Sequence, residues 1–491
     1  MPTHTFLKNP LARSWRRLRR RPPAMQVRTG VIALAVVIVI VTWLVLAPSG
    51  MAGASTPVSA ASTSSRGVST KSITVVFPVI SLTSLQGKFG LAEDREFGQQ
   101  KYAINLFVNQ INKAGGIHGR MIHPMIVSYD PTDEANMRSL CKQWTEGSPA
   151  VFAVIDGIGS WIGDNQLCIT QEGHTPMIAQ WTTVTNWTQL GSPYLWWTGA
   201  DQAPVLQATV SWGLSSGRLG HGKKVGIVVS DQSSDQSALN QYLLPDLKKA
   251  GITPQVYTVA ANTNETASTS SDATLAVERL KAAGVASVIP MLPENALFPY
   301  LAAENSQSYF PHLLLSDYQS SIELGIGLIP TPYEKALDGQ EGVTTETLGG
   351  FDDARPESQG GYDPGVRSCY ATWHKAHPKE IAGTTSHFIE EQGPIAGWCD
   401  AIRLFAQAAT NAGSHLTRRS FVTAMSKITN FAGSYSPTWS FGPHKMYGPT
   451  QYQVVKLHNN VPPSSQCLLK TNHKPQGTCW VVVQKWKPLP T

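Results

Sequence analysis

Short apolar runs alternate with longer amphipathic stretches from residue 73 onward, and the first unit of this pattern is the clearest. Residues 73–78 (ITVVFP) predict a buried strand, and residues 91–113 carry apolar side chains at helical spacing. Gly115 and Gly116 end this helix, because glycine readily adopts the left-handed turn that follows many helices. Residues 125–127 then predict a second strand. The pattern is that of one strand–helix–strand unit.

The same alternation continues along the rest of the chain. Further strands are predicted at residues 150–155, 175–179, 225–230, 255–259, 287–291, 312–316 and 451–457. Further helices are predicted at residues 163–172, 237–250, 274–283, 295–306, 366–376 and 393–411. Alternating strands and helices form parallel sheets covered on both faces, so the predicted fold class is α/β. Two parts are less regular: we expect residues 337–357 to be a surface excursion and residues 467–483 to be a hairpin.

The N-terminal segment has the charge and hydropathy pattern of an export signal. Residues 1–30 carry eight basic side chains and no acidic one, and residues 31–47 are apolar apart from Thr42. This asymmetry places the N-terminus in the cytoplasm and the rest outside. Small residues at 52–54 offer a cleavage site, so both a cleaved signal and a retained transmembrane anchor are open. Residues 48–71, rich in Ser, Thr and Ala, are expected to form a flexible linker.

The charge of the chain is concentrated in this segment. The formal net charge is +6, and the eight basic residues near the N-terminus leave about −2 on the remainder. The basic character is therefore a targeting feature, and we exclude nucleic acid as a partner.

The six cysteines of an exported chain predict disulfides. There is no Cys-x-x-Cys motif and no histidine at ligand spacing, so we expect no metal site. Sequence alone leaves the pairing open, and separation along the chain favours Cys141–Cys168, Cys369–Cys399 and Cys467–Cys479.

Motifs for catalysis are weak throughout. The segment 157–163 (GIGSWIG) lacks the Gly-x-Ser-x-Gly spacing of a hydrolase nucleophile. The segment 217–223 (GRLGHGK) is followed by Lys224 where a phosphate-binding loop needs Ser or Thr, and it precedes its strand. The adjacent acidic pairs at 352–353 and 390–391 splay apart in any regular element. We therefore expect no enzyme activity and no cofactor.

A solute-binding protein needs only polar and aromatic residues at the carboxyl ends of parallel strands. The residues at such positions are Phe89, Ser160, Trp161, Trp181, Thr182, Thr183, Asp231, Glu294, Asp317 and Tyr318. Several have a structural alternative. Ser160, Thr182 and Asp231 can cap the next helix, and Asp317 and Tyr318 can be ordinary turn residues. The two tryptophans can simply pack against the protein.

Residues 109–130 (NQINKAGGIHGRMIHPMIVSYD) resemble the leucine/isoleucine/valine-binding type I periplasmic substrate-binding proteins of ABC importers. The chain after residue 71 is too long for one typical core, so two lobes are expected. The resemblance implies two Rossmann-like lobes hinged by three crossings near Gly199, Gly349 and Pro443. The first lobe would then hold residues 72–199 and 350–442, and the second residues 200–349 and 443–491.

The resemblance also implies roles for individual residues. Ser160 and Thr182–Thr183 would hold the ligand carboxylate, and Asp317 its ammonium group. Phe89 corresponds to an aromatic residue in the first loop. Trp161 and Trp181 stand where the relatives have smaller residues, which favours a bulkier or flatter ligand.

The sequence thus predicts an extracytoplasmic protein that captures a small polar or amphipathic, amino-acid-like molecule and delivers it to an ABC permease. The first alternative is a membrane-anchored ligand-sensing receptor ectodomain on the same fold. An exported enzyme on this fold is the second alternative. An uncleaved N-terminal segment would add the membrane as a partner.

Overall fold

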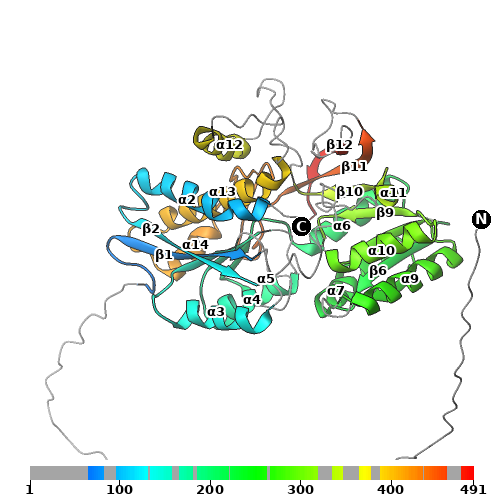
Figure 1. Ribbon diagram of the computed structural model, residues 1–491, viewed down its shortest axis with the longest axis horizontal. Helices are drawn as coiled ribbons and strands as arrows, with labels where there is room; N and C mark the ends of the chain where they lie inside the picture. The colour runs from blue at the N-terminus through cyan, green and yellow to red at the C-terminus, as the bar shows by residue number, and fades with distance from the viewer. Residues whose placement is uncertain are drawn as a thin grey trace, which may run out of the picture. The chain divides into compact units, whose positions relative to one another are not determined.

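The computed structural model describes residues 65–81, 95–130, 133–156, 165–180, 185–220, 222–261, 266–318, 334–346, 364–377, 388–434, 436–461 and 477–490. All of them belong to one compact unit, Ser62–Thr491. This unit contains two β-sheets, each flanked by helices (Figure 1). The α/β prediction is confirmed.

The first sheet is parallel throughout and has the strand order β2-β1-β3-β4-β5. Its strands are β1 (Ser72–Ile80), β2 (Met121–Tyr129), β3 (Ala153–Asp156), β4 (Met177–Ala179) and β5 (Leu195–Trp197). The associated helices are α2 (Arg95–Lys113), α3 (Glu134–Glu146), α4 (Asn165–Leu167), η1 (Cys168–Glu172), α5 (Thr185–Gly191), α12 (Pro364–Ala376), α13 (Phe388–Asn411) and α14 (Arg418–Met425).

Both faces of this sheet are buried because successive side chains of a strand point to opposite faces. Val75 and Phe77 of β1 belong to a core with α2, α12, α13 and α14. Val76, between them, belongs to a second core with α3 and η1. Gly115 and Gly116 follow α2 with φ of 101° and 68°, which confirms the predicted left-handed turn.

The second sheet has the order β12-β11-β10-β9-β8-β6-β7. Its strands are β6 (Val225–Ser230), β7 (Gln255–Val259), β8 (Ser287–Met291), β9 (His312–Ser316), β10 (Glu341–Thr344), β11 (Gln451–Val461) and β12 (Gly477–Pro488). Its helices are α6 (Gln202–Ser215), α7 (Ser233–Ala238), η2 (Leu239–Leu243), α8 (Leu244–Lys249), α9 (Thr266–Ala283), α10 (Glu294–Ser306) and α11 (Glu334–Leu337). Strands β6 to β10 are parallel, whereas β11 and β12 pair antiparallel.

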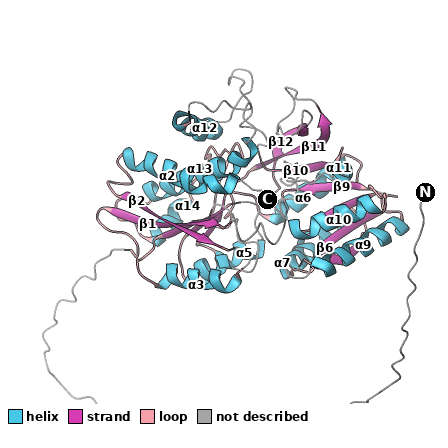
Figure 2. Ribbon diagram, in the orientation of Figure 1, coloured by secondary structure: helices cyan, strands magenta, loops and turns pink. Residues whose placement is uncertain are grey.

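Helices cover both faces of the second sheet as well (Figure 2). Val228 packs against α9 and α10, which lie side by side, while Ile227 and Val229 pack against α6 and the segment from α7 to α8. The predicted strands at 225–230, 255–259, 287–291 and 312–316 coincide with β6 to β9. The apolar runs of β6, β8 and β9 made these strands easy to predict.

The chain passes between the two sheets three times. It leaves the first sheet between β5 and α6, returns between β10 and α12, and leaves again between α14 and β11. The predicted crossings near Gly199, Gly349 and Pro443 fall in these connections, although Gly349 lies outside the described residues. The lobe boundaries themselves stay a prediction.

The prediction for residues 337–357 is wrong at β10, which is an internal strand. Gly342, Val343 and Thr344 are buried, and β10 pairs with β9 on one side and β11 on the other. The segment EGVT has one large apolar side chain, so no apolar pattern indicates a strand. Its neighbours in the sheet decide its conformation.

The C-terminal hairpin also has other bounds than predicted. It is formed by β11 and β12, and β12 extends to Pro488 instead of ending at residue 483. The strand β5 and the helix α6 were not predicted, since β5 contains only three residues. Helix α6 is buried around most of its circumference, so its sequence has little amphipathic pattern.

Two of the three predicted disulfides are confirmed. Cys141–Cys168 joins α3 to η1, and Cys369–Cys399 joins α12 to α13. Cys467 lies outside the described residues, so its pairing with Cys479 stays a prediction. The segment 31–47 lies outside them too, and no helix in the described ranges is both long and apolar enough to cross a membrane.

Helix α10 places one carboxyl group inside the apolar core of the second sheet. Glu304 is fully buried, and burial raises its pKa well above the usual value, while the Tyr300 hydroxyl one turn earlier lowers it by less. The folded protein therefore keeps a proton that the unfolded chain loses above about pH 4.5. Stability should fall as pH rises above that value, by up to about 1.4 kcal/mol per pH unit.

We expect Glu304→Gln to remove this cost. The variant should melt at a higher temperature than the wild type at pH 8, and the difference should close toward pH 4. Thermal unfolding followed by circular dichroism across this pH range measures the effect. Glu278→Gln, on the exposed face of α9, is the matched control. If the melting temperatures of the wild type and Glu304→Gln differed by the same amount at every pH, the prediction would be contradicted.

Candidate functional site

The carboxyl ends of the parallel strands in the second sheet hold four of the ten predicted ligand-binding residues. Asp231 follows β6, and Asp317 and Tyr318 follow β9. Glu294 is the first residue of α10, and its side chain is not described. The other six lie outside the described residues: Phe89, Ser160, Trp161, Trp181, Thr182 and Thr183.

Tyr318 and Asp235 form a buried hydrogen-bonded pair between two strand ends. The Tyr318 hydroxyl donates to Asp235 Oδ1 at 2.5 Å, and the Ser230 hydroxyl donates to Asp235 Oδ2 at 2.5 Å. Burial, with a contribution from Asp235, raises the pKa of Tyr318 well above its usual value, so Tyr318 is the donor. Asp235 was not among the predicted residues, although it is an acidic residue in the first turn of the helix after β6.

Asp317 has a different environment. Its Oδ2 atom accepts hydrogen bonds from the Thr345 amide at 2.6 Å and the Thr345 hydroxyl at 2.7 Å. Its Oδ1 atom is buried and has no hydrogen-bond partner among the residues that the structure describes. Burial raises the pKa of Asp317 to about 6, and the hydrogen bonds from Thr345 and Thr344 act in the opposite direction. Asp317 is therefore an ionisable side chain with one oxygen, Oδ1, that lacks a hydrogen-bond donor among the described residues.

Asp231 does not cap a helix, which was the structural alternative to its predicted role as a ligand contact. It does not pair with Asp317 either. The cap of α7 is Gln232, and the Asp231 carboxylate accepts a hydrogen bond from the Ala261 amide at 2.9 Å. This bond ties the end of β6 to the segment after β7. Asp231 remains exposed, so its role toward a ligand stays a prediction.

In the first sheet, Gln180 directly follows β4 and precedes the predicted residues Trp181 to Thr183. It is buried, and its side chain lies against Gly397 of α13. A Cβ atom at residue 397 would overlap the side-chain amide of Gln180, so glycine is required for this contact. Gln180 thus anchors the start of this loop on α13.

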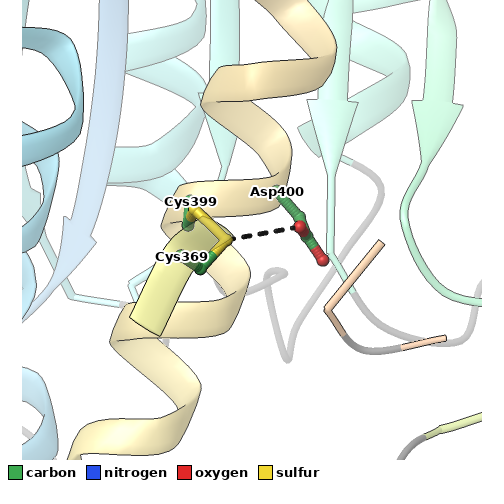
Figure 3. Close-up of side chains that lie close together, drawn as sticks. All are labelled: Cys369, Cys399 and Asp400. Atoms are coloured by element: carbon green, nitrogen blue, oxygen red, sulfur yellow. Dashed lines mark hydrogen bonds between the residues drawn. A yellow bond between two sulfur atoms is a disulfide. The ribbon is translucent and has the colours of Figure 1, made fainter. Parts of the chain in front are cut away.

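One group of side chains has the composition of a metal site but not its chemistry. Cys369, Cys399 and Asp400 lie close together (Figure 3). The two cysteines form a disulfide and therefore offer no thiolate, which is the form that binds metals. The Asp400 carboxylate is occupied by the Ser434 amide and hydroxyl, at 2.6 Å and 2.7 Å, and by Arg403 at 3.2 Å. The group is a structural link between α12 and α13.

A small cavity lies beside the first sheet, next to α3. Its volume of about 30 Å³ is enough for one or two water molecules and too small for an organic solute. The cavity is lined by Pro78, Tyr129, Met137, Leu140, Trp144, Asn165, Gln166, Ile169 and Met177. It therefore does not compete with the strand ends as a ligand site.

Comparison with known proteins decides the family. Residues 53–315, more than half of the chain, match the periplasmic binding protein family. The chain belongs to this family. No curated protein sequence matches the chain. Membership implies a binding protein in an extracytoplasmic location.

Solved structures of periplasmic binding proteins have the same type I fold. The fatty acid ABC transporter substrate-binding protein from Thermomonospora curvata is 17% identical, with a TM-score of 0.60 over 86% of this chain and 94% of that one. A solute-binding protein of an ABC transporter from Rhodopseudomonas palustris BisB5, in complex with 3,4-dihydroxybenzoic acid, is 15% identical, with a TM-score of 0.57 over 85% and 98%. The leucine-binding protein LivK from Thermotoga maritima is 14% identical, with a TM-score of 0.55 over 79% and 96%.

The Tyr318–Asp235 bond gives a testable prediction for this periplasmic binding protein. Tyr318→Phe removes a hydrogen bond to a buried carboxyl group and should destabilise the protein by about 2 kcal/mol. Tyr309→Phe is the control, because the half-buried Tyr309 hydroxyl donates to a neutral acceptor, the Val285 carbonyl, at 2.9 Å. It should cost about 1 kcal/mol. Chemical unfolding of both variants measures the difference, and equal losses would show that Asp235 does not depend on Tyr318.

Proposed function

We propose that the protein captures a small amino-acid-like solute outside the cytoplasm and delivers it to an ABC importer. The observation that carries this proposal is the Oδ1 atom of Asp317 at the carboxyl end of β9, which is buried and has no hydrogen-bond partner within the described part of the chain. A buried carboxylate oxygen without a donor is costly, and a ligand ammonium group would supply the missing hydrogen bonds. In open α/β sheets, ligands bind at this edge of the strands.

The ligands of the similar proteins of known structure support a small organic molecule as the ligand of this protein. Their descriptions name leucine, a fatty acid and 3,4-dihydroxybenzoic acid, which are all carboxylic acids. Of these, only leucine also carries an ammonium group that an aspartate can bind. Trp161 and Trp181, which stand where relatives have smaller residues, favour a bulkier or flatter side chain than that of leucine. We therefore propose an aromatic or otherwise extended amino-acid-like ligand.

The N-terminal sequence supports a second candidate function. The basic residues 1–30 and the apolar residues 31–47 suit a membrane-anchored ligand-sensing ectodomain as well as a cleaved signal. The intact mass of the protein isolated from its native membrane distinguishes the two. A mass that includes residues 1–47 supports the anchored form, and a mass that lacks them supports secretion.

A thermal-shift screen of the full-length protein tests ligand capture directly. The panel contains amino acids, short amides, urea-like solutes, aromatic acids, fatty acids and sugars. A ligand at one hundred times its dissociation constant should stabilise the folded state by about 2.7 kcal/mol. We expect a response to amino acids with large side chains. A folded protein that responds to none of the panel would contradict the proposal.

The role of Asp317 predicts a distinctive pH dependence of affinity. Its pKa of about 6 in the folded protein is raised from 3.8, so the group is ionised above pH 6 and neutral below it. Ionisation of Asp317 should therefore not change the affinity for an ammonium-bearing ligand above pH 7. The affinity should fall by up to about tenfold per pH unit below pH 6. Isothermal titration calorimetry between pH 5 and 8 measures this change.

Asp317→Asn should weaken binding at least tenfold at pH 7.5 and remove the pH dependence. Asp246→Asn is the control, because Asp246 pairs with the exposed Lys249 on α8. A wild-type affinity that does not vary between pH 5 and 8 would exclude Asp317 as the ammonium site.

A further inference from the structure

Five side chains meet where the chain passes between the two sheets. This crossing cluster consists of Thr185, Asp201, Tyr242, Lys445 and Tyr447. Its members come from α5 beside the first sheet, from the start of α6 and from η2 beside the second, and from the connection between α14 and β11. Two of the three connections between the sheets thus bring a charged group to one place, Asp201 before α6 and Lys445 between α14 and β11.

Asp201 links the two sides of this cluster. It is the N-cap of α6, and its Oδ1 atom accepts a hydrogen bond from the Ala203 amide at 3.0 Å. The same oxygen accepts a hydrogen bond from the hydroxyl of Thr185 on α5. Since Asp201 is only 4% exposed, water cannot replace either donor. A rotation that separates α5 from α6 would leave this buried carboxylate short of a donor, at a cost of about 1–3 kcal/mol.

Lys445 organises the third connection, between α14 and β11. Its ammonium group lies 2.6 Å from the carbonyl oxygens of Ser440 and Tyr447, and 3.1 Å from those of Gly448 and Pro449. It also lies over the Tyr447 ring, 4.0 Å from the centroid. Burial lowers the pKa of Lys445 to about 7, and Asp201 favours the charged form. The carbonyl oxygens favour the charged form as well, because they accept its protons.

The loop that Lys445 organises is attached to the first sheet. The Trp197 amide donates to the Met446 carbonyl at 2.8 Å, and the Gly448 amide donates to the Trp197 carbonyl at 3.0 Å. Residues 446–448 thus extend the first sheet past its edge strand β5. Tyr447 packs against the apolar cores of both sheets. The position of this loop therefore depends on both sheets at once.

Tyr242 closes the cluster from the side of the second sheet. Its hydroxyl group makes hydrogen bonds with the side chains of Thr185 and Gln189 on α5. Asp201 and Tyr242 consequently hold the same threonine from two different elements. These polar contacts are directional, so they add to the apolar packing of Tyr447 in fixing the geometry of this region.

We propose that Asp201 and Lys445 form a hinge lock that sets the angle between the two lobes. They act as positioning residues in ligand capture, since neither follows a strand at the candidate ligand site. The effect on affinity rests on the proposed function, but the effect on geometry does not. Weakening the lock lets the ligand-free protein adopt a wider range of angles between the lobes. A smaller fraction of the molecules then has the lobe angle that binds the ligand.

Distances between spin labels test the lock without any ligand. Labels are introduced as a genetically encoded ketone amino acid at exposed Asn109 on α2 and Glu278 on α9, which leaves the cysteines untouched. We expect the distance distribution of the full-length protein to broaden in Asp201→Asn and in Lys445→Met. The controls Asp246→Asn and Lys427→Met change charge at exposed or surface-paired positions and should reproduce the wild-type distribution.

Thr185→Val provides a second route if the buried variants fail to fold. It removes one of the two α5 hydroxyl groups that hydrogen-bond to Asp201, the other being that of Thr188, and it should also broaden the distance distribution. A wild-type distribution in every folded variant would overturn the lock, even if the melting temperature fell. A broadened distribution in the ligand-free variants supports the lock whether or not the thermal-shift screen finds a ligand.

Affinity supplies the second readout once a ligand is known. We expect Lys445→Met to weaken binding about three- to tenfold, with the pH dependence assigned to Asp317 unchanged. The double variant with Asp201→Asn should lose less than the product of the two single losses, because both groups act on one hinge. Independent, multiplicative losses would show that the two residues do not act together.

Discussion

The burial of both faces of each parallel sheet is the constraint on which the rest of this structure depends. Val75 and Val76 point into different cores, and so do Ile227 and Val228. Because central strands such as β1, β6 and β8 are buried on both sides, they offer no room for a polar site along their length. Strand ends and the connections between sheets are two kinds of position where polar groups can gather instead. The candidate site and the crossing cluster occupy these two kinds of position.

Buried carboxylates show how polar groups inside the protein obtain their hydrogen bonds. Asp400 receives the Ser434 amide and hydroxyl together with Arg403, and Asp235 receives the hydroxyls of Ser230 and Tyr318. The Oδ2 atom of Asp317 accepts hydrogen bonds from the Thr345 amide and hydroxyl, and the Thr344 side chain also hydrogen-bonds to Asp317. A buried carboxylate oxygen without a donor is costly, and the Oδ1 atom of Asp317 has no hydrogen-bond partner among the described residues. This difference separates Asp317 from its structural counterparts.

Local sequence predicted the elements that depend on local pattern. The strands β6, β8 and β9 carry apolar runs, and Gly115 with Gly116 marks the end of α2. The strand β10 has no such run, and its two neighbours in the sheet make it a strand. In the candidate site, the positions of Asp317 and Tyr318 after β9 followed from the strand prediction. Their partners Thr345 and Asp235 did not, because they come from other segments.

The sequence by itself determined the α/β class and the alternation of strands and helices, and it favoured the two cysteine pairs that the structure contains. These properties follow from periodicity, glycine positions and spacing, which are local along the chain. Only the tertiary structure decided which polar groups meet: Tyr318 with Asp235, Gln180 with Gly397, and Asp201 with Thr185. The physical reason is that a buried donor or acceptor is satisfied by whichever group the packing of distant elements brings within about 3 Å.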